Sequence, residues 1–273
     1  MANEIKKIEE KNITDAVQNR IFEMQANKSI DLPCGYSLGN ALKSAYLILQ
    51  ETKTRDKRPV LEVCTPASIT NSLLDMAVQG LNPGKGQCYF IPYGNQLTMS
   101  RSYLGTIAIT KRIKGVKDVK GYAVYKDDTF KLGFDVLTGK TKVEEYVPGL
   151  DRNSENLIGA FAVIIGDNEI LHTEYMDINQ IRAAWNQGTM KGSSPAHKNF
   201  GDQMAIKTVI NRACKLYANT SDDADSISLL MNSTDEVVSH EIEENAHTVE
   251  LNDSTVVDAE TGEVIEEPTT APF

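Results

Sequence analysis

The last 54 residues of the chain, 220–273, contain no Lys or Arg at all, although they contain fifteen Asp and Glu. The whole chain has 28 basic and 38 acidic residues, so positions 1–219 keep all 28 basic residues and only 23 acidic ones. The net charge of −10 therefore hides a mildly basic body that carries an acidic tail. A basic body favours a polyanionic partner, and a separate acidic tail is typical of a solubilising, partner-binding or DNA-mimicking appendage.

Long apolar runs and paired cysteines are also missing. No stretch of about 18 apolar residues is present, which argues against a membrane-spanning helix. The first ten residues lack the apolar core and cleavage site of a signal peptide. The four cysteines are far apart and form no C-x-x-C pair, so we expect free thiols in a reducing compartment. The sequence thus predicts a cytoplasmic protein with no membrane partner.

Recognisable catalytic motifs are absent as well. Segment 133–141 ends in Gly-Lys-Thr, but five residues separate its glycines where a phosphate-binding loop needs four, and segment 80–86 has three. The histidines have no metal-ligand spacing, and no G-x-S-x-G motif occurs. A nuclease built on Asp167 and Glu169 is an unfavoured alternative, because both lie at a predicted hairpin turn. We therefore expect a binding protein, not an enzyme, with no ATP site and no required cofactor.

The hydrophobic pattern predicts helices, then mostly strands, then helices, which is typical of an α+β fold with a small antiparallel or mixed sheet. We divide the chain into an N-terminal helical segment (1–32), a core (33–219) and an acidic, disordered tail (220–273). The expected helices begin at Thr14, Ser37, Thr65-Pro66 and Asp177 or span 101–114 and 201–218, and the expected strands lie within 87–100, 116–125, 129–136, 142–147, 157–165 and 170–175.

The helix expected over 201–218 separates apolar from basic residues. At about 100° per residue, Lys207, Asn211 and Lys215 fall on one face, with Arg212 at its border. A second basic segment, 101–131, has eight basic residues against three acidic ones. Long cations spaced along a surface with few competing carboxylates are what phosphate binding requires. Merely solvated basic faces are the alternative, but two such segments favour nucleic acid.

Two blocks of sequence resemble the RecT family of phage single-strand annealing proteins. The first block comprises Leu81-Asn-Pro-Gly-Lys-Gly-Gln-Cys-Tyr-Phe-Ile-Pro-Tyr and Ser102-Tyr-Leu-Gly-Thr-Ile-Ala-Ile-Thr-Lys-Arg. The second comprises Trp185, Ser193-Ser-Pro-Ala-His, Phe200 and Met204-Ala-Ile-Lys-Thr-Val-Ile-Asn-Arg. The acidic tail is not part of this resemblance.

The resemblance implies ATP-independent annealing of complementary DNA strands in homologous recombination, in the cytoplasm of a host bacterium. It also implies rings or filaments of the protein bound to single-stranded DNA and to the annealed duplex. A phage exonuclease and the host single-strand-binding protein, met through the tail, are further implied partners. The alternative is a non-enzymatic adaptor whose basic body meets an acidic partner.

Residues 1–32 are a candidate for contact with a neighbouring subunit, although an ordinary core helix is the alternative.

The candidate DNA-binding residues form three groups. The first-choice phosphate contacts are Lys111, Arg112, Lys114, Lys117, Lys207, Arg212 and Lys215; the second-choice contacts are Arg101, Lys191 and Lys198; and the candidates for sugar or base contact are Asn211, Gln87 and Tyr89.

Overall fold

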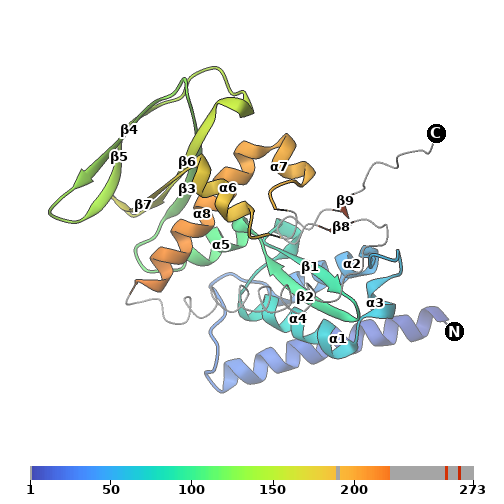
Figure 1. The fold of residues 1–273 in the computed structure, drawn as a ribbon. Helices are drawn as coiled ribbons and strands as arrows, with labels where there is room; N and C mark the ends of the chain where they lie inside the picture. The colour runs from blue at the N-terminus through green and yellow to red at the C-terminus, as the bar shows by residue number, and fades with distance from the viewer. Residues whose placement is uncertain (1, 189–190, 222–255, 258–263, 266–273) are drawn as a thin grey trace, which may run out of the picture. The chain divides into compact units, whose positions relative to one another are not determined.

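The computed structural model describes residues 2–188, 191–221, 256–257 and 264–265. They belong to two compact units, which divide between Gly105 and Thr106. The first unit is mainly helical and the second combines a sheet with helices, so the predicted α+β class is confirmed (Figure 1). The boundaries predicted from the sequence lie after residues 32 and 219, and the division seen in the structure lies at neither. The roles assigned to those three segments stay predictions. None of the helices in the described residues is long and apolar enough to cross a membrane.

The first unit packs its helices around a core of aliphatic side chains. Val17 and Ile21 of the first helix, Leu49 of the second and Leu73 of the fourth are each fully buried. The elements of this unit are α1 (Ala2–Ala26), α2 (Leu38–Glu51), α3 (Val60–Val63), α4 (Pro66–Val78), η1 (Pro83–Lys85), β1 (Cys88–Tyr93) and β2 (Gln96–Arg101), and the pair β8 (Val256–Val257) and β9 (Val264–Ile265) is grouped with it.

The predicted start of α1 was wrong. Thr14 lies inside the helix, which already begins at Ala2. Residues 4–11 are rich in Glu and Lys, which favour helix and have opposite charges at i,i+4 spacing. The charge that suggested a frayed end is therefore compatible with a longer helix. By contrast, Thr65 caps α4 as predicted, because its side chain accepts the Ser68 N–H.

Strands β1 and β2 form the predicted hairpin around a turn at Gly94, whose φ of 59° suits glycine. Two buried serines of α4 connect this hairpin to the helix. The Ser72 hydroxyl donates to the Leu97 carbonyl (2.7 Å), and the Leu97 N–H donates to the Ser68 hydroxyl (3.1 Å). Both backbone groups of Leu97 are thereby satisfied away from water.

The second unit is built on an antiparallel sheet with strand order β3-β6-β7. A separate two-stranded hairpin, β4–β5, is inserted between β3 and β6. All five strands were predicted to within a few residues. The elements of this unit are α5 (Tyr103–Thr110, which crosses the division), β3 (Asp118–Tyr125), β4 (Thr129–Asp135), β5 (Lys140–Val147), η2 (Ser154–Asn156), β6 (Leu157–Ile165), β7 (Ile170–Asp177), α6 (Ile178–Trp185), α7 (Pro195–Asn199) and α8 (Gly201–Asn219).

Helix α8 covers the sheet, packing against all three strands (Figure 1). A Cβ at Gly121 of β3 would lie 2.8 Å from the Ile210 side chain and 3.0 Å from that of Ile206. The missing side chain at Gly121 therefore allows α8 to approach the strand closely. Phe161 of the sheet forms an aromatic cluster with Phe130 and Tyr146 of the β4–β5 hairpin.

Two helices differ from the prediction made for them. The expected helix over 101–114 is shorter, because Arg101 ends β2 and the chain turns at Gly115 with φ 85°. In the predicted loop before α8, the Ser194 side chain caps the short helix α7. Asp177 forms the expected cap of α6, as a capping box with Gln180.

The predicted disorder of the tail lies outside the described residues, apart from 220–221, 256–257 and 264–265.

Candidate nucleic-acid interface

The basic face of α8 is set by the residues that the opposite face buries. Val209 and Ala213 are fully buried, whereas Lys215 is exposed and Lys207 is half-buried. The uninterrupted helix keeps Lys207, Asn211 and Lys215 on one face, as their spacing predicted. Two cations and one amide are therefore held in line on a rigid element.

One edge of this face is organised around the single tryptophan. The Trp185 Nε1–H donates to the Thr208 hydroxyl of α8 (2.9 Å), and the indole packs edge-on against His197, with ring centroids 4.7 Å apart. The Ser194 hydroxyl lies 2.7 Å from His197 Nδ1. A Cβ at Gly192, where φ is 69°, would lie 3.2 Å from Trp185 Cβ. The second sequence block is thus one packed cluster joining α6, α7 and α8.

Exposed lysines stand on the segment that leads into this cluster. Lys191 and Lys198 are both exposed, and Lys191 has a φ of 46° beside Gly192. Neither has a carboxylate partner within 4 Å among the residues that the structure describes. Lys198 thus lies on α7 and Lys191 in the turn before it, both in the segment that connects α6 with α8. Sequence reasoning named Trp185 and Ser194 only as parts of the resemblance and missed that they position this group.

Two further candidates on α8, Arg212 and Asn211, are partly enclosed by other residues of the protein. Arg212 Nε lies 2.8 Å from Glu174 Oε1 of β7, and the Glu174 side chain is only 14 % exposed. His172 Nε2 lies 3.5 Å from the other oxygen of Glu174. Asn211 Oδ1 is buried and receives no hydrogen bond from the described residues. Arg212 therefore already neutralises a carboxylate of the sheet, and its predicted role as a phosphate contact stays a prediction.

The basic segment before β3 is interleaved with carboxylates. Lys111 and Lys120 lie 3.3 Å and 3.0 Å from the two oxygens of Asp118, and Lys117 lies 3.0 Å from Asp167. Desolvation would raise the pKa of Asp118, but hydrogen bonds from Lys120, the Val119 N–H and Lys111 outweigh it, and the pKa is lowered. These cations remain exposed, so phosphate can compete for them.

The remaining members of this segment differ in exposure. Lys114 is exposed and has no ion-pair partner among the described residues, whereas Arg112 is half-buried. Lys120 was not among the candidates, although it is exposed and lies beside Lys111. The signal that could have found Lys120 is its position in the strand, which alternates with buried Val119 and thus turns it outward.

The three candidates in the first unit face different surroundings. Arg101 Nη1 donates to the Gln79 side-chain oxygen (2.9 Å), and the Gln79 amide donates to Asp75 (2.8 Å). Burial raises the pKa of Asp75, against the lowering effects of Gln79 and Arg101. The Gln87 side chain accepts the Asn82 N–H (2.9 Å). Arg101 and Gln87 thus hold the protein's own polar groups, and Tyr89 is the more exposed candidate of this unit.

Hydrogen bonds connect the two halves of the first sequence block. The Ser102 hydroxyl donates to the Gly86 carbonyl (2.6 Å) and accepts the Gly105 N–H (3.2 Å), while the Ser102 N–H donates to the Gln87 carbonyl (3.1 Å). A Cβ at Gly105 would lie 2.1 Å from that carbonyl oxygen. The two halves of the block therefore specify one close backbone contact, which fixes the start of α5.

Taken together, the fold and the basic α8 face define an α+β protein with a surface suited to anions. The chain matches the RecT family over residues 39–250 and belongs to that family. Members of the family bind single-stranded DNA, associate with themselves and act in single-strand annealing recombination of phages. The search of curated proteins finds no match. Among the described residues no cluster of three His, Cys, Asp or Glu could hold a metal ion.

Proposed function

We propose that this protein anneals complementary DNA strands without ATP, as an oligomer that holds one strand by its phosphates. The observation that carries the proposal is the basic face of α8, Lys207 and Lys215, beside the Trp185 cluster in a member of the RecT family. Lys191 and Lys198 extend this cationic surface within the second unit. The exposed cations at 111–120 are a further contact region, once phosphate replaces Asp118 and Asp167.

Phosphate contacts explain how annealing can proceed without a nucleotide cofactor. Lysine and arginine contacts to phosphate are blind to sequence and leave the base edges available to a second strand. Pairing with that strand then provides about 1.4 kcal/mol per base-pair step, which is enough to drive the reaction. The protein's contribution is to extend one strand and concentrate the other.

The salt dependence of single-strand binding tests the proposed contacts. The logarithm of the affinity is plotted against the logarithm of the salt concentration. Lys207→Ala and Lys215→Ala should each lower the magnitude of the slope of this plot by about 0.7, because each variant makes one phosphate contact fewer and so releases one counterion fewer on binding. Lys140→Ala, an exposed lysine on the β4–β5 hairpin, is the matched control and should leave the slope unchanged. Unchanged slopes for both α8 variants would remove this face from the interface.

Annealing itself is measured with two complementary fluorescent oligonucleotides in the absence of ATP. The wild-type protein should accelerate pairing, and the α8 variants should lose acceleration in proportion to their lost affinity. An adaptor protein, the alternative function, would bind oligonucleotides with no dependence on their length and would not accelerate pairing. Contacts of the acidic tail with a phage exonuclease and with the host single-strand-binding protein also belong to this proposal.

A further inference from the structure

A loop of the second unit presents a leucine completely to solvent. Leu150 follows β5 and is 101 % exposed, and Val147 at the end of that strand is 54 % exposed. Asp127, Asp151 and Glu155 lie in the adjoining turns and are also exposed. We call these five residues the Leu150 knob. Exposed apolar surface rimmed by charged residues is a form that protein-interaction sites take.

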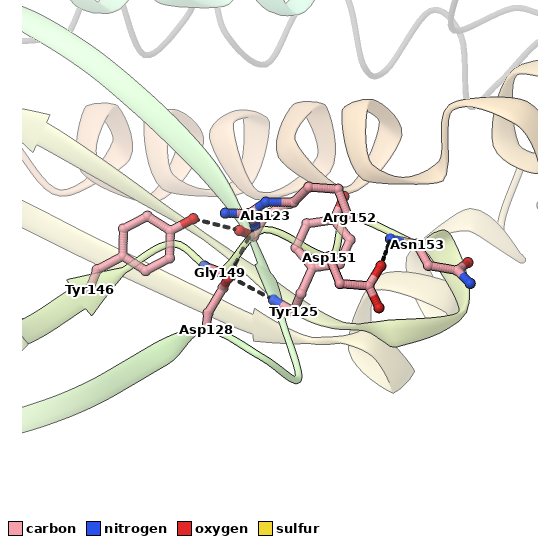
Figure 2. Close-up of polar contacts among 8 residues, drawn as sticks. All are labelled: Ala123, Tyr125, Asp128, Tyr146, Gly149, Asp151, Arg152 and Asn153. Carbon is pink, nitrogen blue, oxygen red and sulfur yellow. Dashed lines mark hydrogen bonds and ion pairs between the residues drawn. The ribbon is translucent and has the colours of Figure 1, made fainter.

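The backbone beneath the knob is held by a buried carboxylate. The Asp128 side chain is 0 % exposed, and it accepts the N–H groups of Tyr125 (2.9 Å) and Gly149 (2.7 Å) and a guanidinium hydrogen of Arg152 (3.1 Å), as Figure 2 shows. A Cβ at Gly149 would lie 2.8 Å from the Asp127 carbonyl oxygen, so glycine is required there. Burying an ion pair contributes little net stability, but it can specify one conformation.

The charge that the knob presents outward is acidic. Arg152 pairs with Asp128 and lies over the Tyr125 ring at 4.7 Å, so its charge is directed into the loop (Figure 2). Asp151 accepts the Asn153 N–H (3.0 Å), which leaves its carboxylate at the surface. Lys126 and Arg152 are the exposed bases next to the knob in the sequence, and Arg152 is already paired with Asp128. Carboxylates around an apolar centre disfavour DNA phosphates and favour a basic protein surface that also has apolar residues.

The first unit carries a surface of that kind. Leu47 and Ile48 of α2 are 53 % and 37 % exposed. The tight turn that follows, residues 52–59, holds four basic residues and one acidic residue, and it is closed by a bridge between Lys53 and Pro59. We call Leu47, Ile48 and the basic residues Lys53, Arg55, Lys57 and Arg58 the α2 patch. None of them was a candidate for DNA binding.

We propose that the Leu150 knob of one copy of this chain binds the α2 patch of a second copy, head to tail. Two knobs facing each other would bring like charges together, so a symmetric pair through the knob is disfavoured. A contact between two different surfaces leaves a knob open at one end of the assembly and an α2 patch open at the other, and it can therefore extend into a ring or a filament. The inference rests on the self-association that forms part of the proposed function, and it specifies the surfaces.

Two variants that each destroy one surface test the inference without DNA. Leu150→Arg places a cation in the knob, and the double variant Lys53→Glu/Arg58→Glu reverses the charge of the patch. Sedimentation velocity should find each variant alone shifted towards monomer, with association at least tenfold weaker than wild type. Their equimolar mixture should form dimers that grow no further, because only one intact knob and one intact patch remain to pair. Leu137→Arg, at a 97 % exposed leucine of the β4–β5 hairpin tip, is the control and should assemble as wild type.

Retention of wild-type assembly by either variant would overturn the inference, as would a mixture that stays monomeric. A mixture that assembles like wild type would also overturn it, because another surface would then suffice. Far-ultraviolet circular dichroism spectra like that of wild type, together with cooperative urea unfolding, establish that each variant is folded. Binding of a short single-stranded oligonucleotide, measured alongside, separates the two proposals: its absence in the wild-type protein would defeat DNA binding and leave the assembly result standing.

Discussion

Two regions of the second unit use ion pairs in opposite ways. At the Leu150 knob, the carboxylate of the Asp128–Arg152 pair is 0 % exposed, whereas in the Lys117–Asp167 pair beside β3 the two side chains are 61 % and 71 % exposed. A buried carboxylate such as that of Asp128 cannot exchange its hydrogen-bond donors for water, so it fixes the backbone around it. An exposed pair contributes little and can exchange its carboxylate for a phosphate. Burial of the partner carboxylate thus separates cations that stabilise this protein from cations available to a ligand.

The largest effect expected from this comparison is the loss of Asp128. Asp128→Ala should lower the free energy of unfolding by about 3 kcal/mol, because Arg152 and two backbone N–H groups lose their acceptor at once. Urea denaturation measures it. Asp127→Ala, at the exposed neighbouring carboxylate, is the control and should change stability by less than about 0.5 kcal/mol. Equal effects of the two substitutions would mean that burial does not distinguish these acids.

Arg212 lies between the two extremes and should give an intermediate effect. Its partner Glu174 is 14 % exposed, while Arg212 itself is 49 % exposed. Arg212→Ala should therefore cost about 1.5 kcal/mol in unfolding free energy, since a mostly buried carboxylate loses its charged hydrogen-bond donor. Lys215→Ala on the same helix should cost less than about 0.5 kcal/mol. If Arg212→Ala were as mild as Lys215→Ala, Arg212 would belong with the cations available to DNA.

The same contrast explains how much the sequence could predict. The strands were found because apolar residues alternate and Gly, Asn and Asp mark their turns, and the face of α8 followed from helical periodicity. Both signals are local. The start of α1 was missed because a charged segment such as 4–11 is compatible with both helix and coil, and neighbouring residues alone do not decide between them.

The candidate site was predictable only as far as those local signals reach. The common face of Lys207 and Lys215 is a property of one helix and was predicted. The pairing of Arg212 with Glu174 depends on how α8 lies across β7, and that of Lys117 with Asp167 depends on the antiparallel register of β3 and β6. Such partners are far apart in the sequence, so counting basic residues overestimated how many cations lack a carboxylate.

An exposed carboxylate that pairs with a lysine of the proposed DNA interface should act as a weak competitor. Asp167→Asn should therefore strengthen single-strand binding by about twofold at low salt, which corresponds to an exposed ion pair of about 0.5 kcal/mol. Titration of a fluorescent oligonucleotide measures this, with Glu155→Gln at the knob as a control that removes the same charge elsewhere. An equal gain from both substitutions would indicate a general charge effect, and no gain from either would remove Lys117 from the proposed contacts.

The smallest expected effect is the pH dependence of the Asp118 cluster. The pKa of Asp118 is lowered in the folded protein, so its stabilising contribution is present above the ordinary carboxyl pKa, about 3.9, and is lost as the pH falls through the lowered value. Because Asp118 and its two lysines are each at least one-third exposed, Asp118→Asn should cost less than about 0.5 kcal/mol at pH 7. Urea midpoints of wild type and variant should converge as the pH is lowered towards 3. A difference that widened on acidification would have the wrong sign for a carboxylate held by Lys111 and Lys120, and it would place these lysines back among the cations without a structural partner.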